Sequence, residues 1–296
     1  MSPLVRAYIL LHLAVMLFGF TAILGALISL PALSLVWWRV GIASISLLFF
    51  TRGFKFLTTL PSKQILRFSG IGAIIAVHWV SFFASVKLAG ASVCLVCMAT
   101  TCFFLSLIEP LLIRKPFNRF DFFIAFLIVP GMALVVQNID AERYGGVLAG
   151  LFSAFLAAVF SSLNKKYITR ASVWNISWIE MTSALLTLSI LLWIYQAMAG
   201  PLPWWPAKAD WAYLLILGVL CTTIAHAMSL FALHHVSAFA LNLVINLEPV
   251  YGILLAMVLL KENKSLNAGF YTGAAVILIA VLSYPYLQKR LSHVAR

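Results

Sequence analysis

Ten long apolar runs follow one another along the chain, and they constrain its fold more than any other feature. A helix needs about 20 apolar residues to cross the hydrocarbon core of a bilayer. The runs are continuous, whereas membrane strands alternate apolar and polar residues. We therefore expect an all-α polytopic membrane protein with ten transmembrane helices. The expected spans are 7–28, 33–51, 65–86, 91–113, 120–137, 146–168, 175–198, 211–232, 237–260 and 267–286.

Composition argues against a soluble protein. Of the 296 residues, 64% are hydrophobic and 9% are charged. A soluble domain of this length cannot bury so much apolar surface in its core. The net charge of +12 would suggest nucleic acid in a soluble domain, but basic residues also flank membrane spans. We therefore expect the lipid bilayer as a partner, and no nucleic acid.

The distribution of Lys and Arg predicts the orientation of the spans. Fourteen of the 20 fall on one side of the expected membrane and five on the other, while Arg39 lies inside a span. Positively charged loops stay in the cytoplasm. Both termini are therefore expected to be cytoplasmic.

The chain also resembles itself. Residues 78–84 (HWVSFFA) match residues 226–232 (HAMSLFA) at four of seven positions, 148 residues apart. A weaker match relates Arg39 to Glu180, 141 residues further on. Two halves, 1–140 and 141–296, would each hold five spans. Because five is odd, the second half would be inverted in the membrane, an architecture of transporters that bind solute at the midplane.

A segment of the ninth expected span resembles a known family. Residues 246–251 (NLEPVY), followed by Lys261-Glu262, resemble the proline-containing helix and the Lys/Arg-Glu turn of the EamA-like branch of the drug/metabolite transporter superfamily. The resemblance covers essentially the whole chain. It implies a transporter of the cell (inner) membrane that exports amino acids or other metabolites. In the first half Thr101-Cys102 stands where the family often has a proline, so we expect a less kinked helix there.

Ionisable groups inside the spans are the candidate functional residues, because each costs about 2.5–3.5 kcal/mol on insertion scales. They are Arg39, His78, Glu109, Glu180, His226 and Glu248. With polar and aromatic neighbours at helical spacing, they predict a substrate site made of His78, Trp79, Thr101, His226, Asn242, Asn246, Glu248 and Tyr251. Interhelical hydrogen bonding is the alternative role for these polar groups. The candidate coupling or gating residues are Glu248, Arg39 and Glu180.

Glu248 is the strongest of these candidates. It lies 13 residues before Lys261, which is roughly 20 Å along a helix and thus near mid-membrane. Pro249 opens the helix beside it by removing a backbone donor. No basic residue lies within a turn of Glu248, and Arg39 is expected nearer the outer face. We therefore expect a substrate ammonium or a proton to neutralise Glu248, and competition between the two would give antiport.

Arg39, Glu180 and Glu109 also have plainer interpretations. Arg39 would extend to lipid headgroups, or else bind a substrate carboxylate or form a gating ion pair. Glu180 would pair with a basic residue at the inner end of its span, namely Lys165, Lys166 or Arg170. Glu109 would pair with Arg114 or Lys115.

The sequence thus predicts a secondary transporter, an exporter, of a small polar or amphipathic metabolite such as an amino acid. Transport would proceed by alternating access, with the proton as candidate coupling ion. Two alternatives stay open: an uncoupled facilitator or channel, and an intramembrane lipid-modifying enzyme.

We expect no enzyme activity, no catalytic residues, no metal and no other cofactor. The sequence contains neither a phosphate-binding G-x-x-x-x-G-K-[ST] loop nor a G-x-S-x-G elbow. Its four cysteines have no zinc-site spacing. Substrate, direction, coupling ion and oligomeric state stay open at this point.

Overall fold

The structure, a computed structural model, describes residues 2–51, 54–245, 247–264 and 266–294, and every regular element in these ranges is helical. The first half contains α1 (Pro3–Leu27), α2 (Ala32–Thr51), α3 (Lys55–Thr59), α4 (Ser62–Ala89), α5 (Ala91–Ala99), α6 (Thr101–Ile113), α7 (Arg119–Phe126) and α8 (Ile128–Gln137). The second half contains the helices η1 (Ala141–Arg143), α9 (Tyr144–Tyr167), η2 (Ile168–Arg170), α10 (Val173–Ala199), α11 (Asp210–Leu215), η3 (Ile216–Ile224), α12 (Ala225–Leu233), α13 (Ala238–Ile245), α14 (Glu248–Leu255), η4 (Ala256–Leu260), η5 (Glu262–Lys264) and α15 (Ala268–Val294).

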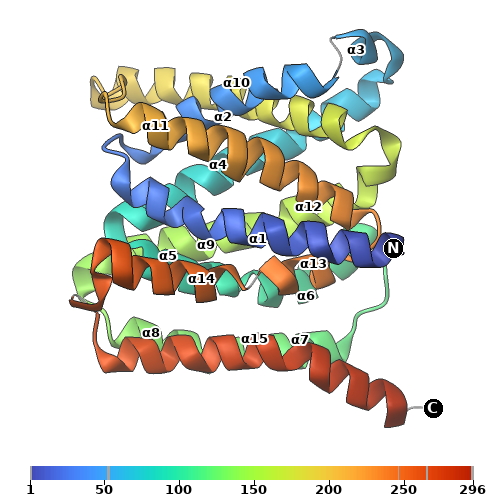
Figure 1. Ribbon diagram of the computed structural model, residues 1–296, viewed down its shortest axis with the longest axis vertical. Helices are drawn as coiled ribbons and strands as arrows, with labels where there is room; N and C mark the ends of the chain where they lie inside the picture. The colour runs from blue at the N-terminus through green and yellow to red at the C-terminus, as the bar shows by residue number, and fades with distance from the viewer. Residues whose placement is uncertain (1, 52–53, 246, 265, 295–296) are drawn as a thin grey trace.

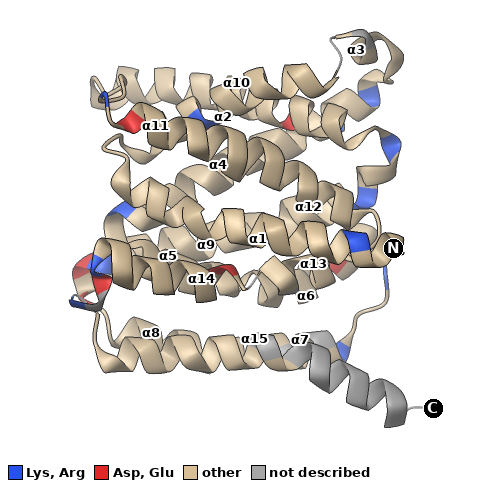
Figure 2. Cartoon of the chain, viewed as in Figure 1, with Lys and Arg blue, Asp and Glu red and all other residues tan. Residues whose placement is uncertain are grey.

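The helices run side by side and turn back at two opposite ends of the molecule (Figure 1). The N-terminus and the C-terminus lie at the same end. Helix α4 packs against both α9 and α10, and α8 packs against α15 at one edge. Figure 2 shows that Lys and Arg lie mostly toward the ends of the helices, as flanking basic residues of membrane spans do.

Seven helical segments of the described chain are long and apolar enough to cross a membrane. They are Pro3–Leu27, Ala32–Thr51, Ser62–Ala89, Ala91–Ile113, Ala141–Arg170, Val173–Ala199 and Asp210–Leu233. The other three expected spans coincide with the shorter apolar helices Ile128–Gln137, Glu248–Leu260 and Ala268–Ala280. The structure confirms an all-helical membrane protein, and the count of ten spans stays a prediction.

Local sequence explains where the long helices begin and end. Ser2 caps α1 by accepting a hydrogen bond from the backbone of Val5, with Pro3 at the first helical position. Gly90 ends α4 with φ of 99°, in the region that favours glycine. Gly146 lets α9 pack closely against the end of α4. A side chain at this position would not fit, because its Cβ would lie 2.5 Å from the Cβ of Ala89.

Two of the apolar segments are interrupted at corresponding places. The fourth expected span divides at Thr100 between α5 and α6, and the ninth divides at Leu247 just before Pro249. We expected the fourth span to be less kinked because it lacks the proline, and this comparison of the two kinks stays a prediction. At the interruption, the Thr100 hydroxyl donates to the carbonyl of Cys97 over 2.6 Å, and the Thr100 N–H bonds to that same carbonyl. Threonine can compete in this way for the backbone acceptors of a helix.

Candidate functional site

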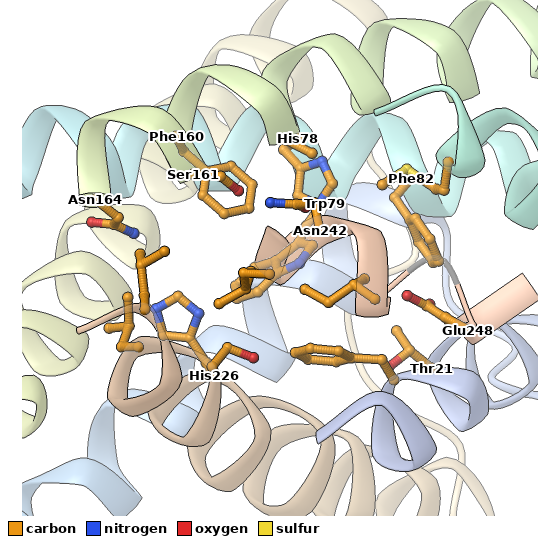
Figure 3. A pocket seen from close by; sticks show the side chains of 18 of the residues that line it. Thr21, His78, Trp79, Phe82, Phe160, Ser161, Asn164, His226, Asn242 and Glu248 are labelled. Carbon is orange, nitrogen blue, oxygen red and sulfur yellow. The ribbon is translucent and has the colours of Figure 1, made fainter. Parts of the chain in front are cut away.

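One cavity, of about 110 Å³, lies among α1, α2, α4, α5, α9, α12, α13 and α14 (Figure 3). Its apolar wall is rich in aromatic rings and consists of Phe18, Trp79, Phe82, Met98, Ala157, Phe160, Leu230, Leu233, Leu241 and Ile245. Its polar lining consists of Thr21, Arg39, His78, Ser161, Asn164, His226, Ser229, Asn242 and Glu248. The cavity therefore brings together residues from the first and second halves of the sequence. Two of them, Arg39 and Glu248, carry formal charges of opposite sign.

Most of the predicted site residues that the structure describes meet in this cavity. The lining includes His78, Trp79, His226, Asn242 and Glu248 from the expected substrate site, and also Arg39. Glu180 lies behind His226 and does not line the cavity.

Two of the predicted substrate residues that the structure describes are not among the cavity lining. Thr101 donates its hydroxyl to the carbonyl of Met98 over 2.7 Å. Tyr251 is 42% exposed and lies outside the cavity lining. Asn246 falls outside the described residues.

The sequence analysis missed four polar lining residues, which are Thr21, Ser161, Asn164 and Ser229. Ser229 carried a signal, because it is one of the four identical positions of the internal match. The other three are single Thr, Ser or Asn residues inside or at the end of apolar runs, where local hydrogen bonding to the backbone is the usual expectation.

Arg39 is held inside the protein rather than at the headgroups. Its exposed fraction is 1%, so the expectation that it extends to the membrane surface is wrong. Its Nε donates to Oγ1 of Thr222 over 2.6 Å, and its guanidinium carbon lies 4.0 Å from the ring centroid of Trp79. Its Nη1 has no hydrogen-bond partner among the described residues. A guanidinium fixed in this way can receive a carboxylate.

Thr222, the partner of Arg39, lies in the π-helix η3. The Thr222 hydroxyl donates to the carbonyl of Leu217, five residues earlier, over 2.6 Å. Its oxygen then accepts the bond from Arg39. π-Helical segments occur frequently at functional sites, and this one fixes the orientation of the buried guanidinium.

Glu248 stands at the start of α14, beside Pro249, and is 7% exposed. The N-terminus of a helix favours a carboxylate electrostatically. Glu248 and Arg39 line the same cavity, although no ion pair within 4.0 Å joins them among the described residues. Arg39 is thus a basic residue on another helix that spacing along the helix of Glu248 does not reveal.

Glu180 pairs with a histidine instead of a lysine. Its carboxylate is fully buried, and its Oε2 lies 2.8 Å from Nε2 of His226. The expected lysine partners are wrong, since Lys165 and Lys166 donate to backbone carbonyls near helix ends. The expected pairing of Glu109 is confirmed with Lys115, at 2.8 Å.

His78 is fixed by α9 at the cavity wall. Its Nδ1 lies 2.8 Å from Oγ of Ser153 and 2.9 Å from the carbonyl oxygen of the same residue. Its ring centroid lies 5.2 Å from that of Phe160. These contacts satisfy one ring nitrogen and hold the imidazole in place. Among the described residues no group of three or more His, Cys, Asp or Glu side chains is arranged to hold a metal ion.

A helical membrane protein with a polar cavity enclosed by many helices is typical of solute transporters. The chain belongs to the EamA-like transporter family, whose model matches residues 5–137 and again residues 144–292. This confirms the resemblance found in the sequence and makes the protein a multi-pass membrane transporter of the drug/metabolite type.

The fold is similar to that of solved structures, 29 chains of which match. One of them, a crystal structure described only as that of a "protein", has a TM-score of 0.70 and 17% sequence identity, covering 96% of this chain and 98% of its own. At this identity the likeness bears on the fold alone. No curated protein matches the chain.

Proposed function

We propose that the protein is a secondary transporter that exports a small zwitterionic metabolite, such as an amino acid, by alternating access. The observation that carries this proposal is the pair of buried, opposite charges, Arg39 and Glu248, on one cavity. A zwitterion brings a carboxylate and an ammonium together. Its binding would therefore leave the net charge of the cavity unchanged inside the low-dielectric protein.

Arg39 and Glu248 would each bind one charged group of the solute. The free Nη1 of Arg39 offers hydrogen bonds to the carboxylate, while Glu248 accepts from the ammonium. The aromatic rings of Trp79, Phe82 and Phe160 line the same space and would contact an apolar side group of the solute. Buried charges in spans pair or bind ligands because an isolated charge there is expensive.

Alternating access would come from two inverted halves, 1–140 and 141–296, with ten spans in total. Two separate matches to one family model support the repeat. The helix interruptions at Thr100 and Leu247 support it too, because their separation is close to the 148-residue offset of the internal match.

The proposed orientation has both termini in the cytoplasm and the protein in the cell (inner) membrane. The shared end of the two termini (Figure 1) and the excess of basic residues on that side support it. Reporter fusions at Arg114 and Lys166 should give cytoplasmic signals, whereas those at Arg143 and Lys208 should give external signals. A cytoplasmic signal at Arg143 would contradict the inverted repeat.

Counterflow into proteoliposomes tests the proposed function. Purified full-length protein is reconstituted into vesicles loaded with an unlabelled mixture of the common L-amino acids, and uptake of the same mixture labelled with ¹⁴C is measured. We expect uptake well above that of protein-free vesicles, with the solutes chemically unchanged. Uptake no higher than in protein-free vesicles would contradict the proposed solute class, and altered products would favour the enzyme.

A further inference from the structure

A second buried acid lies next to the cavity and plays no part in the proposed solute binding. This acid is Glu180, on α10, and its only ion-pair partner among the described residues is His226 of α12. Its Oε1 has no hydrogen-bond partner among the described residues, although the amide of Asn164 on α9 lies beside the carboxylate. His226 and Asn164 both line the cavity (Figure 3).

The charges on the surrounding helices do not neutralise this acid. Arg39 of α2 and Glu248 of α14, which carry opposite formal charges, both line the shared cavity. On α9, Lys165 donates its ammonium protons to two backbone carbonyls. The elements around the Glu180–His226 pair also carry other charged or titratable groups, which include Arg6, Tyr8, His12, Arg39, Lys63, Arg67, His78, Lys87, Tyr144, Lys165, Lys166, Tyr167, Tyr195, Cys221, His234 and Glu248.

The Glu180 carboxylate must therefore be neutralised within the Glu180–His226 pair itself, because the protein interior has a low dielectric constant. With a neutral imidazole and an ionised carboxylate, the pair carries one negative charge, and leaving such a charge uncompensated is costly. One bound proton makes the pair neutral, because the imidazolium then donates Nε2–H to the carboxylate. Imidazole is also the side chain whose charge changes near neutral pH.

One helical element links this pair to the solute site. Thr222, which holds Arg39, and His226, which holds Glu180, lie four residues apart on the continuous stretch from η3 into α12. Residues four apart share a helix face. A movement of this stretch when Arg39 binds a carboxylate would therefore also move His226 relative to Glu180.

We propose that Glu180 and His226 together bind one proton, and that this pair couples solute export to the proton gradient. The inference rests on the proposed function and adds a coupling site to it. His226 lines the cavity and Glu180 does not, so the proton enters and leaves through the imidazole. Glu248, balanced by Arg39, binds solute rather than the coupling proton.

The transport test compares two assays on the same reconstituted protein, with the ¹⁴C-labelled L-amino acid mixture as the probe. The first is counterflow without a pH gradient, and the second is uptake driven by an acidic vesicle interior. At one proton per solute, a gradient of one pH unit supports about tenfold accumulation. We expect Glu180→Gln and His226→Gln to abolish this gradient-driven accumulation and to retain counterflow. Glu142→Gln, an exposed acid in η1, is the matched control and should behave as wild type.

A proton titration decides the inference even if the probe is not transported. Potentiometric titration of purified wild type should show one more proton bound near neutral pH than Glu180→Gln, in which His226 has no anion to stabilise its positive charge. Infrared difference spectra with pH should show a carboxyl or imidazole signal that Glu180→Gln loses. Unchanged gradient-driven accumulation in both variants, or unchanged proton binding in Glu180→Gln, would overturn the inference. Failure of wild-type counterflow with intact proton binding would instead contradict only the proposed solute class.

Discussion

One buried acidic side chain lines the cavity and a second lies behind its wall, and the fold gives the two different partners. Glu248 shares the cavity with Arg39, a cation that stays charged at every physiological pH. Glu180 is fully buried behind His226, a partner whose charge depends on pH. The comparison teaches that residue type and depth alone do not assign a role. An acid whose partner is permanently charged is suited to binding a charged solute. An acid whose partner can gain or lose a proton is suited to binding a proton.

The largest effect is expected at Glu248. Glu248→Gln leaves Arg39 buried without its balancing charge and removes the group that would bind an ammonium. Losing one partner of a buried charge pair costs about 2 kcal/mol or more, which corresponds to at least about thirtyfold in affinity. Counterflow of the labelled L-amino acid mixture should therefore be lost, while membrane insertion is retained. Counterflow at the wild-type rate would remove Glu248 from the solute site.

A smaller effect is expected from Arg39→Lys. The substitution keeps the positive charge but loses the planar fork that receives a carboxylate through two hydrogen bonds. It also loses the Nε donor to Thr222. Counterflow should require roughly tenfold more solute, a loss of about 1.4 kcal/mol. If half-maximal counterflow occurs at the wild-type concentration, Arg39 acts only as the counter-charge of Glu248.

The smallest effect is expected at Thr222, which orients Arg39 without lining the cavity. Thr222→Val keeps the side-chain shape but removes the acceptor for Nε. One buried hydrogen bond contributes about 1 kcal/mol, or roughly fivefold in affinity. Thr187→Val, which removes a hydroxyl bonded to its own helix on α10, is a suitable control. Equal behaviour of the two variants in counterflow would show that the π-helix does not position the guanidinium.

Helix positions could be predicted from the sequence because their signals are local. Apolar runs, together with residues such as Ser2, Pro31 and Gly90, mark helices and their ends within a few positions. The interruption at Thr100 was missed for a physical reason. The usual signal for a break is proline, whereas hydroxyl residues also bond carbonyls of their own turn inside continuous helices, as Ser106 does in α6.

The partners of the charged residues could not be predicted, because each pairing joins distant parts of the chain. Arg39 and Thr222 are 183 residues apart, and Glu180 and His226 are 46 apart. The nearest basic residues in sequence were therefore the wrong candidates for Glu180. Depth in the membrane did select residues that come together, since Arg39, His78, His226 and Glu248 all line the cavity, while their role stays a prediction.

The charge class of the exported solutes tests the central claim most directly. Cells that express wild type, Glu248→Gln or Arg39→Gln at matched levels are grown, and the metabolites that accumulate in the medium are compared by mass spectrometry. We predict that the solutes enriched by wild type carry both an ammonium and a carboxylate, and that neither variant enriches them. Enrichment of solutes that lack one of these groups, or equal enrichment by wild type and both variants, would contradict a zwitterion site between Arg39 and Glu248.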